Sequence, residues 1–136
     1  MSDEITLVRG AIHNPAEPRH FMRIVPVDRT VTVTAAGVEV ARSTRASKVK
    51  EVGRDVYDPV VYLPREDVEM ARLERVERTT HCPLKGDTEY FDLVLDDGRI
   101  EHAAWSYVST FDFAVELQGL MAFDTSLVDV VEHRAD

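Results

Sequence analysis

The feature that most constrains the fold is a series of short segments in which apolar and polar residues alternate, each ending at turn-forming residues. The clearest pair, residues 89–95 and 99–105, flanks an Asp-Asp-Gly sequence at residues 96–98. Alternation with a period of two is the pattern of a half-buried strand. Asp-Gly suits the primed two-residue turns that match the twist of paired strands. The sequence therefore predicts a β-hairpin with a primed turn at this point.

The same pattern recurs along the chain and sets the fold class. Further strands are predicted at residues 21–27, 30–34, 38–42, 48–52, 56–63 and 127–131. Gly37 closes the turn of a second hairpin, at a position that requires positive φ. Short helices are expected over residues 65–73, which follow Pro64, and over residues 112–118, which Asp112 would cap. We therefore predict a mainly β fold of antiparallel sheets with hairpins and one or two short helices.

The length and the N-terminal composition indicate the domain organisation. A chain of 136 residues fits one domain with its own hydrophobic core. Residues 1–20 mix charges with Asn-Pro and Glu-Pro pairs and show no sustained period. We expect an extended N-terminal arm over residues 1–20, followed by a single β-rich domain over residues 21–136.

Charge and cysteine content limit the partners and the compartment. Acidic residues outnumber basic residues 25 to 16, so the net charge of -9 disfavours nucleic acid and anionic membranes. The chain has one cysteine, which excludes an intrachain disulfide, and its start lacks the pattern of a signal peptide. We expect a cytoplasmic protein that binds neither nucleic acid nor membrane. A homodimer is left open.

Two segments concentrate the chemically versatile side chains. Residues 79–86 read Thr-Thr-His-Cys-Pro-Leu-Lys-Gly and are called here the cysteine loop. Residues 103–107 read Ala-Ala-Trp-Ser-Tyr and are called the tryptophan strand. Trp105 and Tyr107 should lie on one side of that strand, where they either belong to the core or stack on a ligand. We expect the two segments to form two walls of one site.

Within the cysteine loop, His81 and Cys82 are the candidate catalytic residues. Pro83 favours extended backbone at Cys82, so the side chains of His81 and Cys82 should point to opposite faces. Lys85 is a better electrostatic partner for the thiol, because a nearby cation favours the reactive thiolate. Lys85 could also bind an anion. The competing interpretation is that Cys82 is a small buried residue and that backbone groups satisfy His81.

The sequence offers no recognisable metal or cofactor motif. A structural zinc site needs four closely spaced cysteine or histidine ligands, whereas this chain has one cysteine and five scattered histidines. A Gly-rich phosphate loop, a paired-histidine helix and a Gly-x-Ser-x-Gly elbow are also absent from the sequence. We therefore expect no metal and no cofactor.

Taken together, residues 59–68, residues 80–86 and the tryptophan strand resemble domain-of-unknown-function family 427. The resemblance runs from about residue 31 to residue 131. It implies a small, mainly bacterial or fungal protein with a fold similar to the β-tent, and some members carry a nucleotidyltransferase label. The signature positions that it implies are Tyr62, Pro64, Arg65, Glu66, Asp67, His81, Cys82, Lys85, Gly86, Trp105, Ser106 and Tyr107.

The chain departs from the related patterns in two ways. Leu84 stands where the family commonly has an aromatic residue, and the paired cysteines of zinc-bound β-tents are missing, so the core must hold the fold. Nucleotidyl transfer would need carboxylates that hold Mg²⁺ near the phosphates. Glu66 and Asp67 are the nearest pair in the motifs, but adjacent residues at a helix start do not converge well on one ion.

Two functional hypotheses follow from these motifs. The first is a pocket, formed by the cysteine loop and the tryptophan strand, that binds a small polar or anionic metabolite and carries out catalysis if His81 or Cys82 is suitably placed. Its expected ligand-binding residues are Tyr62, Arg65, Lys85, Trp105 and Tyr107. The second is a non-catalytic interaction or accessory module, in which the same motifs only stabilise the fold.

Overall fold

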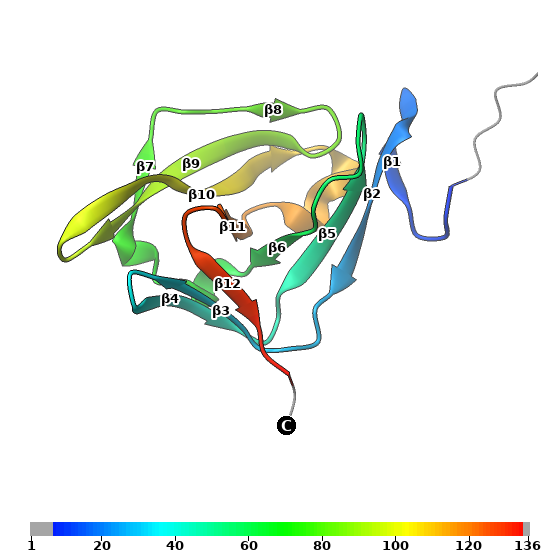
Figure 1. Ribbon diagram of the computed structural model, residues 1–136. Coiled ribbons are helices and arrows are strands. Elements are labelled where there is room, and N and C mark those ends of the chain that lie inside the picture. The colour runs from blue at the N-terminus through cyan, green and yellow to red at the C-terminus, as the bar shows by residue number, and fades with distance from the viewer. Residues whose placement is uncertain (1–6, 135–136) are drawn as a thin grey trace, which may run out of the picture.

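The computed structural model describes residues 7–134, and two antiparallel sheets make up most of that range (Figure 1). The larger sheet contains β1 (Ile12–Asn14), β2 (Glu17–Pro26), β5 (Ser47–Val52), β6 (Val60–Leu63), β7 (Leu73–Val76), β8 (His81–Cys82), β9 (Gly86–Leu95), β10 (Gly98–Thr110) and β11 (Met121–Phe123). The smaller contains β3 (Val31–Ala35), β4 (Val38–Ser43) and β12 (Asp129–Glu132). Short 3₁₀ helices are η1 (Arg65–Asp67), η2 (Met70–Arg72) and η3 (Asp112–Leu117). The prediction of a mainly β fold with antiparallel sheets is confirmed.

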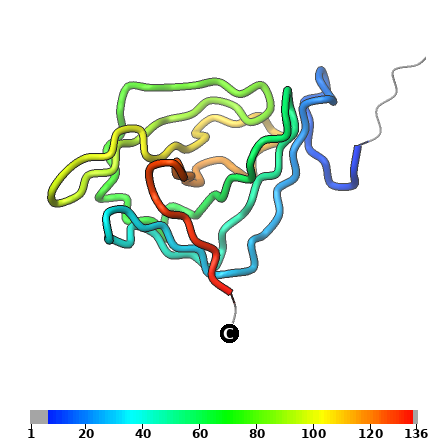
Figure 2. The backbone as a smooth tube through the Cα atoms, viewed as in Figure 1, coloured from blue at the N-terminus to red at the C-terminus, as the bar shows by residue number. Residues whose placement is uncertain are grey.

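The larger sheet is strongly curved. Its strand order is β1-β2-β5-β6-β11-β10-β9, and both β7 and β8 pair with the outer edge of β9. Figure 2 shows the sheet curving from the N-terminal strands, in blue, to the green and yellow strands β7 to β10, with the smaller sheet beneath it. The curvature brings β5, β8 and β10, which are distant in sequence, around one face of the sheet.

Two hydrophobic clusters lie on opposite faces of the larger sheet. Leu63, Met121 and Phe123 pack toward the smaller sheet, whereas Tyr62 and Ala122 pack in the second cluster. Successive residues of β6 and β11 therefore contribute to opposite clusters, as the period of two requires. Complete burial of a leucine contributes about 1.5–3 kcal/mol. The chain has one cysteine and therefore no intrachain disulfide, so these two clusters hold the fold together.

Leu84, Met22 and Leu117 are fully buried in the second cluster. Leu84 belongs to the cysteine loop, so this loop is anchored by a core residue rather than lying free on the surface. The position where the family commonly has an aromatic residue is therefore a packing position in this chain.

The N-terminal strands extend the larger sheet at one edge. β1 pairs with β2, and β2 pairs with β5 over residues 21–26. Residue 20, the expected end of the N-terminal arm, lies within β2. The arm expected over residues 1–20 also includes residues 1–6, which lie outside the described residues.

Both predicted hairpins form, but only one has the predicted turn geometry. Ala36 and Gly37 have φ values of 49° and 79°, as a primed turn between β3 and β4 requires. The β9–β10 hairpin is also present, with Leu95 paired to Gly98. Its turn residues Asp96 and Asp97 do not have positive φ, and Gly98 lies outside the left-handed region. The prediction of a primed turn there was wrong.

The helix predicted over residues 65–73 was also wrong. Val68 has φ -115° and ψ 139°, which is extended backbone, and it forms a bridge with Ala41 of β4. The N–H of Glu69 then donates to the carbonyl of Val40 at 2.9 Å. Pairing with β4 therefore divides the segment into η1 and η2, and its last residue begins β7. None of the helices in the described part of the chain has the length and apolar run needed to cross a bilayer.

Candidate functional site

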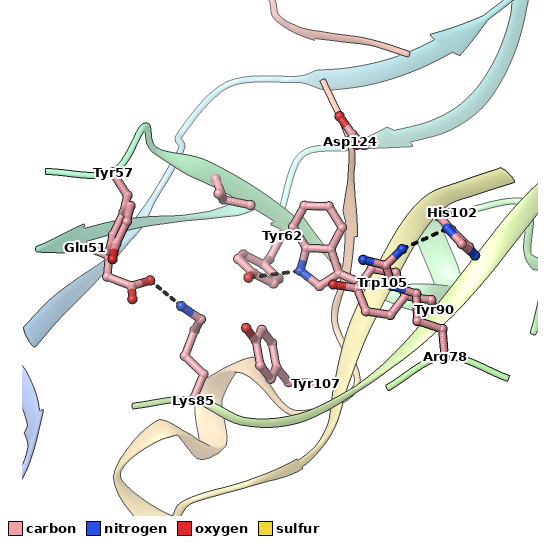
Figure 3. A pocket seen from close by; sticks show the side chains of 11 residues that line it. Glu51, Tyr57, Tyr62, Arg78, Lys85, Tyr90, His102, Trp105, Tyr107 and Asp124 are labelled. Carbon is pink, nitrogen blue, oxygen red and sulfur yellow. Dashed lines mark hydrogen bonds and ion pairs between the residues drawn. The ribbon is translucent and has the colours of Figure 1, made fainter. Parts of the chain in front are cut away.

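A cavity of about 420 Å³ lies beside the tryptophan strand, on the face of the larger sheet that carries the second hydrophobic cluster (Figure 3). Strands β5, β6, β9 and β10, together with the cysteine loop, contribute its walls. Pockets for small molecules commonly have volumes of roughly 300–1,000 Å³, and the volume of this cavity lies within that range.

Five aromatic side chains line the cavity: Tyr57, and four that the sheet register places together, Tyr62, Tyr90, Trp105 and Tyr107. In the sheet register Tyr62 lies opposite Ala122, Ala122 lies opposite Trp105, and Trp105 lies opposite Tyr90. The small side chain of Ala122 leaves space for the indole of Trp105 to reach across β11, and its Nε1 donates to the Tyr62 hydroxyl at 3.4 Å. Tyr107 follows two residues later on the same side of β10, with its ring centroid 6.4 Å from that of Tyr62. Cross-strand pairing therefore assembles the aromatic wall.

The buried tyrosines present protonated hydroxyls to the cavity. Burial raises the pKa of Tyr62 and of Tyr107, so both phenols remain neutral hydrogen-bond donors at physiological pH. The Tyr107 hydroxyl forms no hydrogen bond with any residue between 7 and 134, although Tyr107 is only 8% exposed. This hydroxyl is not fully buried and is free to bind water or a ligand in the cavity.

One end of the cavity holds a buried ion pair. The Lys85 ammonium pairs with Oε1 of Glu51, and the two side chains are only 8% and 12% exposed. The other carboxylate oxygen, Oε2, is 2.6 Å from Nε2 of His20. Lys85 also lies 5.5 Å from the centroid of the Tyr107 ring. The charge of Lys85 is therefore already compensated by Glu51.

The opposite end carries the guanidinium of Arg78. Its Cζ lies 4.6 Å from the centroid of the Tyr90 ring, and Nη1 donates to Nδ1 of His102 at 2.9 Å. Arginine can only donate, so Nδ1 of His102 accepts this hydrogen bond. Arg78 is exposed, and no carboxylate among residues 7–134 lies within ion-pair distance of it. This end of the cavity therefore has a positive charge without a carboxylate partner.

A bulge in β10 places His102 beside Arg78. The pairing of β10 with β9 shifts register between Ile100 and Ala104, and His102 within the shift has a φ of 54°. Asp92 accepts the backbone N–H of His102 at 2.9 Å and a second hydrogen bond from Arg99, also at 2.9 Å. Bulges commonly redirect a side chain next to a functional site.

Stability at acid pH should depend on Asp92. Burial raises the pKa of Asp92, but the hydrogen bonds from His102 and Arg99 outweigh burial and hold this pKa below its ordinary value. A depressed carboxyl pKa stabilises the fold above the unfolded value of about 3.9, and this contribution is lost as the pH falls through the folded pKa. We expect the free energy of unfolding to decline below pH about 4 in urea titrations.

The Asp92→Asn variant should lose less stability than the parent between pH about 5 and pH about 2, because it lacks this titrating group. Asp97→Asn, at the exposed β9–β10 turn, should keep the parental profile. Identical profiles for Asp92→Asn and the parent would contradict the assignment.

The cavity brings together four of the five residues expected to bind a ligand, namely Tyr62, Lys85, Trp105 and Tyr107. Arg65 does not line it. Its Nε donates to the carbonyl of Gly119 at 2.7 Å, and its guanidinium lies 5.7 Å from the Phe91 ring centroid. Arg65 therefore connects η1 to the segment between η3 and β11.

The two candidate catalytic residues also lie outside the lining of this cavity. His81 is exposed, and its Nδ1 is 2.7 Å from a carboxylate oxygen of Asp87. Cys82 is half-buried and lies close to His20 and Glu51. As expected for extended backbone, adjacent positions in β8 give His81 and Cys82 different surroundings.

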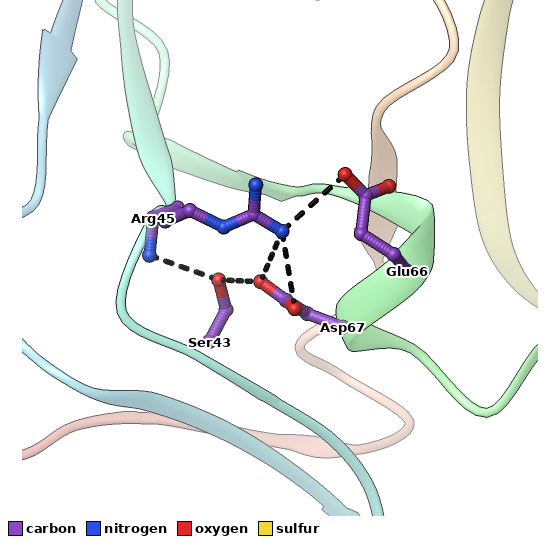
Figure 4. A network of polar contacts seen from close by, with 4 residues as sticks. All are labelled: Ser43, Arg45, Glu66 and Asp67. Atoms are coloured by element: carbon purple, nitrogen blue, oxygen red, sulfur yellow. Dashed lines mark hydrogen bonds and ion pairs between the residues drawn. The ribbon is translucent and has the colours of Figure 1, made fainter.

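Glu66 and Asp67 are held in a structural network (Figure 4). The Ser43 hydroxyl donates to Asp67 at 2.6 Å, and Arg45 lies 3.3 Å from carboxylate oxygens of both acidic residues. The Ser43 hydrogen bond is the main reason that the pKa of Asp67 is lowered. These carboxylates connect η1 to the β4–β5 turn and do not line the aromatic cavity.

Sequence reasoning missed seven residues of the cavity lining, namely Glu51, Tyr57, Val60, Arg78, Tyr90, His102 and Asp124. Glu51 and Tyr90 lie on predicted strands, but their strands had no motif that marked them, and Arg78 lies in the connection after β7. The alternation of residues 89–95 places Tyr90 on one face of its strand, and this was the only sequence signal that pointed to Tyr90.

Comparison with known proteins adds one finding. The model of the family described as "Domain of unknown function (DUF427)", labelled NTP_transf_9, matches residues 23–134. The match includes the smaller sheet, the larger sheet except β1 and the first part of β2, and every cavity residue discussed above. It confirms the resemblance drawn from the three sequence motifs. No curated protein matches the chain.

Proposed function

We propose that this chain, which belongs to the DUF427 family, binds a small planar metabolite with one anionic group in the aromatic cavity. The observation that carries the proposal is the guanidinium of Arg78, which has no carboxylate partner among the described residues and lies at the edge of an aromatic wall. The cysteine loop contributes Lys85, and the tryptophan strand contributes Trp105 and Tyr107.

The aromatic wall favours a planar ligand. Trp105 and Tyr90 have ring centroids 6.4 Å apart and an interplanar angle of 35°, so they form a broad apolar surface. Aromatic rings prefer offset-stacked or tilted contacts with other rings, and each such contact contributes about 0.5–1.5 kcal/mol beyond burial. A heteroaromatic or phenyl ring could make several of these contacts at once.

The charge distribution favours an anionic group near Arg78. Glu51 neutralises Lys85, so the anion should be recognised by Arg78 rather than by the lysine of the cysteine loop. A guanidinium can donate two parallel hydrogen bonds to a carboxylate or phosphate. The acidic chain as a whole does not prevent this, because a local basic group can still bind a small anion.

The alternative, a module whose motifs are only structural, accounts for part of the pattern. Leu84 packs in the second hydrophobic cluster, and the hydrogen bond from Arg65 to Gly119 connects two segments of the chain. A purely structural role gives no reason for the Arg78 guanidinium to lie beside the aromatic wall without a carboxylate partner among the described residues. The proposal is one of binding, because His81 and Cys82 do not line the cavity.

Binding can be measured at the site itself, because Trp105 is the only tryptophan of the chain. Nucleoside monophosphates, aromatic carboxylates and sugar phosphates should be titrated while tryptophan fluorescence is recorded. We expect saturable changes with the first two classes and weaker ones with sugar phosphates, which lack an aromatic ring. A ligand at 100 times its Kd should also stabilise the fold by about 2.7 kcal/mol.

Arg78→Gln should weaken binding of a fluorescence-positive ligand about 10-fold to 100-fold, because a hydrogen bond to a charged group contributes about 1.5–3 kcal/mol. Arg75→Gln is the matched control, since Arg75 is an exposed β7 arginine that pairs with Glu89 at 3.2 Å. A silent panel, or equal losses in the two variants, would contradict the proposal.

A further inference from the structure

We propose that His20, Glu51 and Cys82 bind one divalent transition-metal ion, and that Zn²⁺ fits this donor set best. One ligand atom from each residue lies within 4.8 Å of the other two. The cluster is separate from the stacking surface of the cavity, and it shares only Glu51 with the cavity lining. The inference therefore does not depend on the ligand proposed above.

The fold brings the three residues together from strands that are distant in sequence. Met22 is directly opposite Glu51 in the β2–β5 pair, so His20, two residues away on β2, presents its side chain on the same face as Glu51. Cys82 comes from β8, and the turn that follows it is held against β1 by a hydrogen bond from Asn14 Nδ2 to the carbonyl of Pro83 at 3.1 Å. The thiol therefore approaches the β2–β5 pair from the neighbouring segment.

The donor chemistry selects the class of metal. The cluster offers an imidazole nitrogen, a carboxylate oxygen and a thiolate sulfur, which together suit Zn²⁺ and related transition metals. Mg²⁺ and Ca²⁺ prefer oxygen ligands and are disfavoured by this set. Three protein ligands leave a fourth position of a tetrahedral site for water or another molecule.

The surroundings also suit a metal site. All three residues are half-buried, with 19% of the His20 side chain and 12% of the Glu51 side chain exposed. Lys85 pairs with Oε1 of Glu51, whereas His20 contacts Oε2, so Lys85 can keep orienting the carboxylate from the side away from His20. Binding replaces the thiol proton of Cys82 by the metal, and the proton is released to solvent.

Cobalt provides a direct test on the untagged full chain. Co²⁺ commonly replaces zinc, and a thiolate ligand gives it an intense charge-transfer absorption band. Because Cys82 is the only cysteine, such a band can arise from no other residue. We expect one equivalent of Co²⁺ to produce the band and Zn²⁺ to remove it by displacement.

Cys82→Ser should abolish the band, and His20→Gln should weaken Co²⁺ binding at least about tenfold through loss of a ligand. His81→Gln is the matched control, because His81 adjoins Cys82 but contacts Asp87, and it should retain both the band and the affinity. Circular dichroism should show that all variants are folded. Arg78→Gln should also keep the band, which separates this test from the test of the cavity ligand.

Three results would overturn the proposal. The first is no Co²⁺ binding by the folded parent, and the second is binding without a thiolate band. The third is an unchanged affinity in folded His20→Gln, which would place the metal on Cys82 with other ligands. As a second measurement, Zn²⁺ should raise the Tm of the parent and of His81→Gln but not that of Cys82→Ser.

Discussion

Gly86→Ala is expected to reduce the free energy of unfolding by about 2–6 kcal/mol, because it combines backbone strain with overpacking, each of which costs about 1–3 kcal/mol. Gly86 has a φ of 127°, a backbone conformation that residues other than glycine rarely adopt. A Cβ at this position would overlap the carbonyl oxygen of Ser109 and lie 2.8 Å from Cα of Thr110. Both neighbours are backbone atoms of β10 and cannot turn aside.

This loss is a large fraction of the 5–15 kcal/mol that stabilises a typical domain. Urea unfolding should therefore show a much lower midpoint for Gly86→Ala, or a chain that does not fold. Gly98→Ala is the matched control, because a Cβ at Gly98 meets open space and its φ is ordinary. Gly37→Ala, at a φ of 79° in open space, should lose about 1–2 kcal/mol from strain alone. Equal effects at Gly86 and Gly98 would contradict the argument.

The close approach at Gly86 also positions the site. Gly86 pairs with Cys82 across the β8–β9 turn and with Thr110 of β10. Lys85, the preceding residue, reaches Glu51 from this point. The glycine therefore determines where the cysteine loop lies relative to the tryptophan strand. If a Gly86 variant folds, it should show altered ligand binding at the cavity as well as a lower free energy of unfolding.

Local sequence signals predicted the elements that depend on local chemistry. The β3–β4 turn follows from Gly37, because a tight turn needs a residue with positive φ and glycine adopts positive φ readily. The β9–β10 hairpin follows from alternation on both sides of residues 96–98. Both hairpins are present in the structure, so local sequence signals were sufficient to predict them.

The elements that sequence analysis missed are short and depend on distant partners. β11 contains only Met121–Phe123, and all three residues are buried between β10 and β6, so they show no alternation between apolar and polar residues. β8 contains His81 and Cys82 and exists through pairing with β9. Val68 likewise becomes extended because Ala41 of β4 lies beside it. Tertiary pairing overrides local preference in each case.

The residues of the candidate site fall into the same two groups, those with a local sequence signal and those that depend on distant partners. Lys85 and Trp105, each within a recognisable motif, line one cavity, as the concentration of unusual residues indicated. Arg78 lies in the connection after β7, and His102 reaches it through a bulge that Asp92 holds and that has no clear sequence signal here. The neighbours of Cys82, Glu51 and His20, lie about thirty and about sixty residues upstream, a spacing that no metal motif contains.

The second large effect is expected at the buried ion pair between Lys85 and Glu51. Glu51→Gln keeps the shape of the side chain but leaves the Lys85 ammonium, which is 8% exposed, without a counter-charge. Removing one partner of a buried pair commonly costs about 3–5 kcal/mol, because the remaining charge stays buried. Urea unfolding should show a loss of that size. Glu39→Gln is the matched control, since Glu39 pairs with Arg42 at 45% and 59% side-chain exposure and its loss should change stability little.

A double-mutant cycle tests whether the loss comes from the uncompensated charge. Lys85→Met should cost less than Glu51→Gln, because Glu51 keeps its contact with His20. The double variant Glu51→Gln/Lys85→Met contains neither charge and should regain stability relative to Glu51→Gln alone, since uncharged replacements of a buried pair are often close to neutral. A coupling free energy of about 2 kcal/mol or more would show that the two charges depend on each other. If the two single losses simply add, Lys85 is solvated in the folded protein and does not rely on Glu51.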